Sequence, residues 1–351
     1  MRSARRLLRR KDRRATGEFL AEGRQAVSEA LTADGIVRRL LVAEAAVDDH
    51  QDLLRTAADA AIPIGTRPAE VAAALTDTVT PQGLLAVCRA VDVPLTEALT
   101  PGARLVVFCD QVRDPGNLGT VIRCADAFGA DAVLVSTDAV DLYNPKTVRA
   151  STGSIFHLPI AIGVELGAAT SAARTSGLAV FGADGSASCS VDDLATSGEL
   201  AEPVMWVLGN EAWGLTADHA TLLDRLVALA LYGRAESLNL STAAAVLLYA
   251  TATAQRDRPL RGCRSQVEQQ SEPTAATAGR RGAAGGDVRH LGWPRAGAVL
   301  LAGVSVGKHP ASRAGWSLHD ATRRPRLATR AGSGAAPWRW RTAAPRLRWT
   351  G

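Results

Sequence analysis

The sequence is poor in cysteine and in aromatic residues, and it has no long apolar run. Five cysteines are scattered over 351 residues without a Cys-x-x-Cys pair, so the sequence predicts neither a zinc site nor a disulfide framework. No stretch approaches the roughly 18 consecutive apolar residues of a membrane-spanning helix, and the arginine-rich start lacks the apolar core of a signal peptide. We therefore expect a cytoplasmic protein with no membrane segment and no bound metal.

A glycine-rich dinucleotide motif is also missing. The turn at residues 114–119 does not follow the G-x-G-x-x-G spacing, which argues against a nicotinamide enzyme. The chain does have 47% hydrophobic residues with only 4% aromatics, which is typical of a soluble protein rich in Ala, Val and Leu. Its length is sufficient for two domains.

The net charge of +5 conceals regions of opposite sign. Residues 1–14 carry eight basic side chains and one acidic one, whereas residues 15–256 hold 15 Lys and Arg against 29 Asp and Glu. We therefore predict a basic N-terminal arm over residues 1–17, attached to an acidic body. Such an arm is typical of nucleic-acid binding, although a solvated first helix or a transit-type leader would have the same composition.

Residues 257–351 have a different composition from the rest of the chain. They contain 17 Lys and Arg against 5 Asp and Glu, hold five of the seven tryptophans, and show little amphipathic periodicity. We expect a basic low-complexity tail that is disordered or poorly ordered. Two alternatives are an RNA-binding tail with interleaved aromatic residues and a frameshifted terminus, because GC-rich DNA read in a wrong frame gives a similar composition.

Between these ends the pattern predicts two α/β units. Over residues 18–95, the spacing of apolar residues predicts helices over 18–35, 48–61 and 67–77 and strands over 37–44, 62–66 and 83–91. Prolines at positions 94 and 101 mark residues 96–103 as a linker.

The second unit, residues 104–256, has the stronger pattern. Strands are expected over 104–109, 131–136, 158–162, 178–183, 204–209 and 226–231, and helices over 117–129, 144–151, 165–176, 216–224 and 240–255. Continuous apolar strands that alternate with helices predict an α/β fold with a mostly parallel sheet covered on both faces. Such sheets bind ligands at the carboxyl ends of their strands.

Three loops at strand ends carry unusual polar residues. In "DQVRDPGN" (residues 110–117) a Pro-Gly corner precedes Asn117, which we expect to cap a helix that carries Arg123 beside its apolar stripe. Glu211 follows a buried strand in "GNEAWGL", and Ser237 and Asn239 precede an apolar helix in "YGRAESLN". Each residue alone could be a cap or a salt-bridge partner, but their conjunction indicates a ligand site.

Taken together, "DQVRDPGNLGTVIRCADAFGADAVLVS", "VMWVLGNEAWGL" and "LALYGRAESLNLSTAAAVLLYA" resemble, in order and spacing, the three motifs of the SpoU (TrmH) family of RNA 2'-O-methyltransferases. The upstream segment "KDRRATGEFLAEGRQAVSEAL" is similar to the L30e-like substrate-binding domain of ribosomal-RNA members. The resemblance implies an L30e-like domain over 18–95 and a SpoU methyltransferase domain of the SPOUT class over 104–256. It also implies a C-terminal trefoil knot, which is rare among folds, and a homodimer formed through the knotted domain.

The resemblance also implies a cofactor, S-adenosyl-L-methionine, and the residues that bind it. The cofactor would contact backbone and apolar walls at Leu208, Gly209, Asn210, Leu229, Leu231 and Leu238. The catalytic group would comprise Asn117, Arg123, Glu211, Ser237 and Asn239. The chain departs from the family pattern at Ala230, where many members have proline, and at Trp213 and Glu236, which replace smaller or polar residues.

The implied reaction is an in-line methyl transfer to a ribose 2'-oxygen of RNA, and the expected substrate is 23S ribosomal RNA. This reaction needs no metal. A guanidinium is a poor base, so we expect Arg123 to hold a phosphate and stabilise developing negative charge while the proton leaves through phosphate or water. The alternatives are a transfer-RNA methyltransferase, a ribosomal resistance enzyme of the thiostrepton type, and a non-catalytic RNA-binding or ribosome assembly factor.

Overall fold

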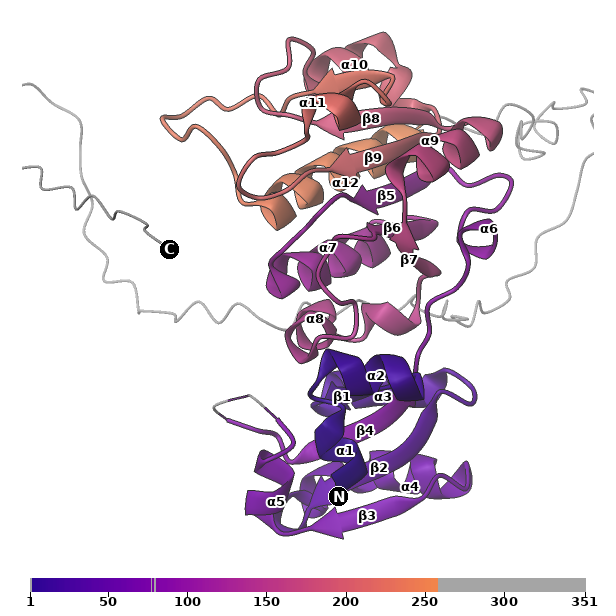
Figure 1. The fold of residues 1–351 in the computed structure, drawn as a ribbon, viewed down its shortest axis with the longest axis vertical. Coiled ribbons are helices and arrows are strands. Elements are labelled where there is room, and N and C mark those ends of the chain that lie inside the picture. The colour runs from indigo at the N-terminus through magenta and orange to yellow at the C-terminus, as the bar shows by residue number, and fades with distance from the viewer. Residues whose placement is uncertain (1, 77, 79, 258–351) are drawn as a thin grey trace, which may run out of the picture. The chain divides into compact units, whose positions relative to one another are not determined.

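The computed structural model describes residues 2–76, 78 and 80–257, and it contains two sheets (Figure 1). The tail predicted over residues 257–351 therefore lies, apart from residue 257, outside the described residues. A four-stranded sheet belongs to the N-terminal part, and a six-stranded sheet to the part that follows.

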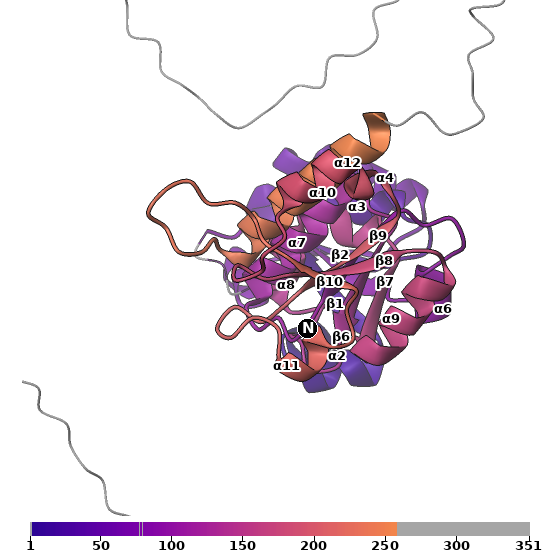
Figure 2. The ribbon, with the colours of Figure 1, turned by 90° about the horizontal axis from the view of Figure 1, so that it is seen from above.

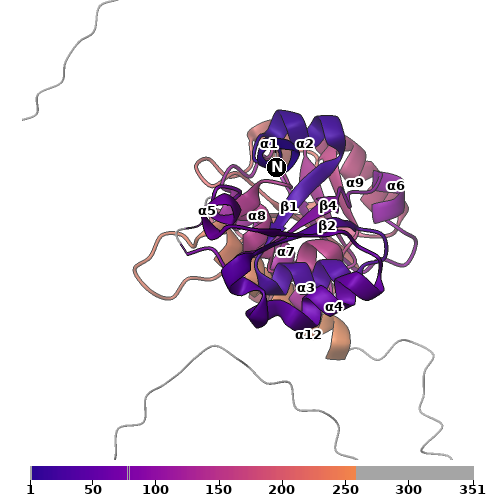
Figure 3. The same ribbon diagram turned by 90° about the horizontal axis from the view of Figure 1, so that it is seen from below.

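The N-terminal sheet has the order β1-β4-β2-β3. Its strands are β1 (Glu18–Glu22), β2 (Val37–Ala43), β3 (Ile64–Arg67) and β4 (Leu84–Arg89). Strand β4 pairs antiparallel with β1 and β2, and β2 pairs parallel with β3. The helical elements are α1 (Arg2–Arg6), α2 (Arg10–Thr16), α3 (Arg24–Thr32), η1 (Glu44–Ala46), η2 (Asp48–His50), α4 (Gln51–Asp59) and α5 (Ala69–Ala73). In Figure 3, α1 and α2 lie on one face of the sheet and α3 and α4 on the other.

The helix predicted over residues 18–35 is wrong for its first five residues. Residues Glu18–Glu22 form β1, which pairs along its length with β4, and its three central side chains are buried. Gly23 then has φ +90°, a conformation that L side chains rarely adopt, and α3 begins only at Arg24. Pairing with a strand more than 60 residues away therefore overrides the helical spacing of the local sequence.

The basic N-terminal segment is packed against this sheet. Residues 2–16 form α1 and α2, and Ala4 and Leu7 are buried in one cluster with Leu20, Leu41 and Leu85 of the sheet. The exposed faces of the two helices carry most of the arginines of this segment. The predicted arm over 1–17 is thus, where the structure describes it, part of the N-terminal fold, because its apolar residues belong to the sheet's core.

The strands of the second sheet are all parallel, which confirms the mostly parallel sheet predicted from the sequence, and their order is β10-β8-β9-β5-β6-β7. Its strands are β5 (Leu105–Cys109), β6 (Ala132–Ser136), β7 (Ile160–Val164), β8 (Ala179–Ala183), β9 (Val204–Leu208) and β10 (Arg225–Val227). Its helical elements are α6 (Leu95–Ala98), α7 (Pro115–Ala127), α8 (Pro145–Ser151), η3 (Ser154–Phe156), α9 (Leu166–Thr175), α10 (Val191–Ser197), η4 (Glu199–Ala201), α11 (Ala217–Ala220) and α12 (Leu240–Asp257).

Helices cover both faces of this sheet (Figure 2). Alternate residues of β5 point to opposite layers: Leu105 and Val107 are buried in the cluster that includes α7, α8 and α12, whereas Val106 and Phe108 are buried in the cluster that includes α6 and α9. Burial on both sides explains why the strands are continuous apolar runs in the sequence.

Two elements near the sheet edge are shorter than predicted. The strand expected over 226–231 ends at Val227, because its partner β8 ends opposite it at Ala183. The helix expected over 216–224 covers only Ala217–Ala220, and the backbone N–H of Asp224 instead donates to the carbonyl of Val180. Residues 229–231, which the predicted strand included, lie instead in the loop that follows β10.

Candidate active site

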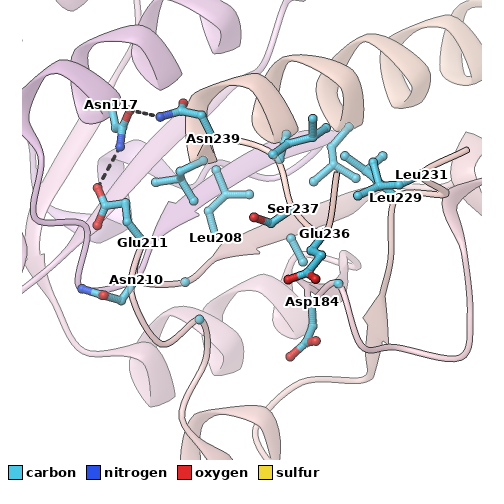
Figure 4. Close-up of a pocket in the computed structure, with 18 of the residues that line it drawn as sticks. Asn117, Asp184, Leu208, Asn210, Glu211, Leu229, Leu231, Glu236, Ser237 and Asn239 are labelled. Carbon is cyan, nitrogen blue, oxygen red and sulfur yellow. Dashed lines mark hydrogen bonds between the residues drawn. The ribbon is translucent and has the colours of Figure 1, made fainter. Parts of the chain in front are cut away.

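A cavity of about 660 Å³ opens at the carboxyl ends of β8, β9 and β10. Figure 4 shows side chains from all three polar loops around it. It contains ten of the eleven residues predicted for the site: Asn117, Leu208, Gly209, Asn210, Glu211, Leu229, Leu231, Ser237, Leu238 and Asn239. The convergence expected of parallel strand ends is therefore present.

A chain of three side chains joins the three loops. The Asn239 amide donates to the Asn117 carbonyl oxygen at 3.0 Å, and the Asn117 amide donates to the Glu211 carboxylate at 3.1 Å (Figure 4). Glu211 also accepts the backbone N–H groups of Arg113 and Asp114, at 3.0 and 3.1 Å. These hydrogen bonds fix the relative positions of the three loops at the cavity.

Glu211 is therefore held as a carboxylate. Partial burial alone would raise the pKa of Glu211, but donation from the Arg113 N–H, the Asn117 amide and the Asp114 N–H outweighs it and lowers the pKa below its usual value. A carboxylate whose charged form is stabilised in this way is a weak proton acceptor. Its geometry suits it to bracing the loops.

The expected role of Asn117 as a helix cap is wrong. Helix α7 begins at Pro115, and its N-cap is Asp114, whose carboxylate accepts the backbone N–H of Asn117 at 2.8 Å. Proline at the first helical position follows the usual preference, because its missing N–H would have no helical partner there. Since Asp114 is the cap, the side chain of Asn117 is available to Glu211 and Asn239.

Gly209 lies where the chain folds back on itself. A Cβ atom on Gly209 would lie 2.5 Å from the carbonyl carbon of Gly214, closer than real contacts allow. Asn210 and Gly214 exchange two backbone hydrogen bonds of 2.9 Å, and the buried Asn210 side chain donates to the Gln111 carbonyl at 2.8 Å. Only glycine fits at residue 209, and Asn210 ties this loop to the one that follows β5.

The third loop supplies the other wall of the cavity. The side-chain oxygen Oδ1 of Asn239 accepts the Ser241 backbone N–H at 2.9 Å at the start of α12, so Asn239 caps the helix and also bonds Asn117 through its amide. Ser237 points into the cavity, and Leu229 and Leu231 lie along its apolar side (Figure 4).

Arg123 does not line the cavity. It lies on the exposed face of α7, and its guanidinium donates to the Thr152 hydroxyl at 3.3 Å. Thr152 ends α8 in the left-handed conformation with φ +52°. The sequence pattern placed Arg123 on the correct helix, but it could not show that the side chain is directed toward α8.

Two acidic lining residues, Asp184 and Glu236, were not among the predicted site residues. Asp184 directly follows β8, so the same reasoning about strand ends could have found it. Glu236 is one of the positions at which the chain departs from the family pattern. Both carboxylates lie on the side of the cavity opposite Asn117 (Figure 4).

The described residues contain no group of three or more His, Cys, Asp and Glu side chains placed to hold a metal ion. No helix within them has the length and apolar character needed to cross a membrane.

The fold and the site define a parallel α/β protein with a polar, loop-built ligand cavity at its strand ends. The SpoU rRNA Methylase family model matches residues 104–249, and the MRM3-like substrate binding domain model matches residues 1–86. The chain belongs to the SpoU methylase family.

Three relatives illustrate the likeness. The 23S rRNA (guanosine(2553)-2'-O)-methyltransferase RlmP of Bacillus subtilis is 35% identical over 240 residues, covering 68% of this chain and 90% of that protein. The 23S rRNA (uridine(2479)-2'-O)-methyltransferase of Streptomyces viridochromogenes is 39% identical over 151 residues, covering 41% of this chain and 51% of that protein. The crystal structure of the SpoU methyltransferase AviRb from Streptomyces viridochromogenes in complex with the cofactor AdoMet superposes with a TM-score of 0.64 at 30% identity, covering 73% of this chain and 98% of that one.

Proposed function

We propose that this protein transfers the methyl group of S-adenosyl-L-methionine to a ribose 2'-hydroxyl of 23S ribosomal RNA. Two of the three relatives named above are 23S rRNA 2'-O-methyltransferases, and the third is a crystal structure that contains AdoMet. The observation that carries the proposal is the Asn239–Asn117–Glu211 chain at the mouth of the cavity. Since the two relatives modify a guanosine and a uridine, the family does not fix the nucleotide.

The cavity fits the proposed cofactor. S-Adenosyl-L-methionine supplies an electrophilic methyl group on a sulfonium sulfur. Leu229, Leu231 and Leu238 offer apolar surface to the adenosine, and the backbone beside Gly209 can approach a ligand closely. The carboxylates that line the cavity suit a donor with a positive sulfonium charge.

The polar residues then have separate roles. Asn117 and Asn239 orient the ribose, and Ser237 offers a hydroxyl inside the cavity. Glu211, ionised and bonded to three donors, braces the loops. Arg123, on the exposed face of α7, engages the phosphate beside the target ribose and stabilises negative charge on the oxygen, and the proton leaves through that phosphate or water.

We also propose the knot and the homodimer that the family pattern implies. After β10 at one edge of the sheet, the chain returns as α12 to pack against α7 and beside β5. Helix α12 exposes Val246 and Tyr249, and the Tyr249 ring lies 5.7 Å from that of Phe128 at the end of α7. This apolar surface is the one we assign to the partner subunit.

The N-terminal part is proposed to bind the RNA. Its basic helices would contact phosphates, which makes the affinity fall as salt rises. The proposed boundaries are 1–17 for the basic segment, which is folded into the N-terminal part, and then 18–95, 96–103, 104–256 and 257–351. The L30e-like character of 18–95 and the cytoplasmic location are further proposals.

Mapping ribose methylation in ribosomal RNA, from cells with and without the gene, tests the proposal. We expect one ribose in 23S rRNA to lose its methyl group on deletion and regain it with the intact gene. Restoration by an Arg123→Ala gene would contradict the assigned role of Arg123. A lost methyl group on transfer RNA would support the alternative substrate, and an unchanged map together with an assembly defect would support a non-catalytic factor.

A further inference from the structure

A second cavity, of about 370 Å³, lies where α2 meets the carboxyl ends of β6 and β7. Its lining includes Arg10 and Arg14 of α2, Thr137 after β6, and Ile162 and Gly163 of β7. The methyl-transfer step proposed above uses none of these residues.

The three arginines that line this cavity differ in whether they are free to bind a ligand. Arg13 is buried; it pairs with Asp141 and donates to the Leu7 carbonyl at 2.8 Å. Arg10 and Arg14 lie four residues apart on one face of α2, both exposed, and neither has a hydrogen-bond or ion-pair partner within the described residues. Two guanidinium groups are thus presented at the cavity, where they can bind a phosphate.

The interior of the cavity is partly apolar and partly acidic. Ile162 and Val140 supply apolar surface, and Asp92 accepts the hydroxyl of Tyr143. The Tyr143 oxygen in turn accepts the backbone N–H of Val91 at 2.7 Å and of Asp92 at 2.8 Å, which fixes the carboxylate. The exposed guanidinium groups suit the phosphate of a nucleotide, and the apolar lining suits its base. The fixed carboxylate of Asp92 can accept a hydrogen bond from an exocyclic amino group of that base.

The second cavity is connected to the first along the same edge of the sheet. Ser136, which lines the second cavity, accepts the Gln111 backbone N–H at 2.8 Å. The Gln111 carbonyl accepts the amide of Asn210 at 2.8 Å, and Asn210 lines the first cavity. Gln111 adopts φ +54°, so this link holds a non-glycine residue in an uncommon conformation.

We propose that the second cavity is an accessory RNA subsite that takes one unpaired nucleotide of the substrate strand. Arg10 and Arg14 bind the phosphate, and the base enters the cavity beside Ile162, within reach of Asp92. The subsite rests on the proposed function, since it assumes an RNA substrate. In this subsite the folded position of the basic segment has a use, because α2 forms one wall of the cavity.

A steric block tests the subsite without changing the charge. Ile162→Trp fills the cavity, and Ile64→Trp is the matched control, because Ile64 is also 39% exposed and lies on an edge strand, β3, outside the cavity. With 23S rRNA transcript as the probe and the full chain as the enzyme, we expect Ile162→Trp to raise KM for RNA roughly tenfold. The Kd for S-adenosyl-L-methionine, measured by calorimetry, and kcat at saturating RNA should stay within twofold. Ile64→Trp should match the parent in every readout.

A charge comparison tests the phosphate contact. Arg10→Ala with Arg14→Ala should weaken RNA binding and flatten the plot of log Kd against log salt by about 0.7, the slope expected for one phosphate contact on a single strand. The matched control, Arg5→Ala with Arg6→Ala on α1, removes the same charge outside the cavity. A smaller effect from the control pair supports the subsite, and equal effects from the two pairs overturn it, because they indicate a diffuse basic surface.

The failure of the subsite differs from the failure of the proposed function. If the parent chain methylates the transcript and Ile162→Trp leaves KM unchanged, the subsite is wrong and the function stands. If the parent chain neither binds nor methylates the transcript, both proposals are overturned. Folding of each variant is checked by its thermal unfolding midpoint, and a variant that binds S-adenosyl-L-methionine normally is folded at the site.

Discussion

The amide of Asn117 donates to the carboxylate of Glu211 at 3.1 Å, although 94 residues separate them in the chain. The contact exists because Asn117 lies in the first turn of the helix after β5 and Glu211 in the loop after β9, and these two strands are neighbours in a parallel sheet. The backbone N–H groups of Arg113 and Asp114 donate to the same carboxylate. The loops at the cavity are thus organised around one ionised acceptor.

Glu211→Gln should lower kcat by about tenfold to a hundredfold, because a neutral amide has one acceptor oxygen and turns its NH2 group toward one of the donors, leaving it unpaired. Steady-state methylation assays measure this change. Glu202→Gln, an acidic residue outside the cavity, is the control and should leave kcat unchanged. A Glu211→Gln enzyme with parental kcat would show that the carboxylate is not needed to brace the loops.

Arg123→Ala should abolish turnover while the binding of S-adenosyl-L-methionine survives, since Arg123 lies outside the cavity and is assigned to the RNA phosphate and the developing oxyanion. Calorimetry gives the cofactor affinity, and a single-turnover assay gives the rate of methyl transfer. Arg55→Ala, at an exposed position of α4, should behave as the parent. Normal turnover in Arg123→Ala would refute the assignment.

Much of the fold could be predicted from the sequence, because several neighbouring residues of each buried strand carry the same apolar signal. The buried parallel strands are unbroken apolar runs, and β5, β6 and β9 lie within one residue of their predicted ranges. Strand β1 was missed because its identity depends on β4, far along the chain. Non-local pairing of this kind leaves no periodic signal in a short segment.

The grouping of the site residues could also be predicted from the sequence, because it follows from the parallel sheet. Parallel strand ends converge, so three loops could be grouped before any contact was known. The individual contacts were not predictable: Asp114 rather than Asn117 caps α7, and Arg123 is directed to Thr152. These outcomes depend on side-chain geometry between elements, which residue spacing does not encode.

Gly209→Ala should destabilise the loop and weaken cofactor binding together. The added methyl group would lie 2.5 Å from the backbone of Gly214, and forced contacts of this kind cost about 1–3 kcal/mol. The control is Gly167→Ala in α9, where no heavy atom would lie within 4 Å of the new Cβ and alanine should stabilise the helix by about 0.5–1 kcal/mol. Chemical denaturation and calorimetry provide the two readouts, and opposite signs for the two variants are expected.

Arg13→Met should lower the free energy of unfolding by about 3–5 kcal/mol, because it leaves Asp141 without its partner in a buried environment. Asp141 is only 12% exposed and Arg13 only 5%. The double variant Arg13→Met with Asp141→Leu should recover much of the loss, since both charges are then absent. Urea unfolding of the parent, the single variant and the double variant measures both effects, and a single variant as stable as the parent contradicts the assigned role of the pair.

His157 should make stability depend on pH. Partial burial lowers its pKa, but hydrogen bonds of 2.8 Å to Asp126 and 3.2 Å to Glu29 outweigh burial and raise the pKa above its usual value. A raised pKa in the folded state means that the stabilising contribution is fully present below the unfolded-state pKa, near 6.5, and is lost as pH rises through the folded-state pKa. Relative to His157→Gln, the parent should therefore lose thermal stability as pH rises from about 6 to 8. A constant difference between the two proteins over this range would contradict the prediction.

The most direct test of the central claim uses purified protein, 23S rRNA transcript and S-adenosyl-L-methionine labelled on the methyl group. After digestion of the RNA to nucleosides, the account predicts that the label elutes as a 2'-O-methylated nucleoside and that Asn117→Ala loses most of it. Label on a base, or no label with cofactor binding intact, would contradict the account.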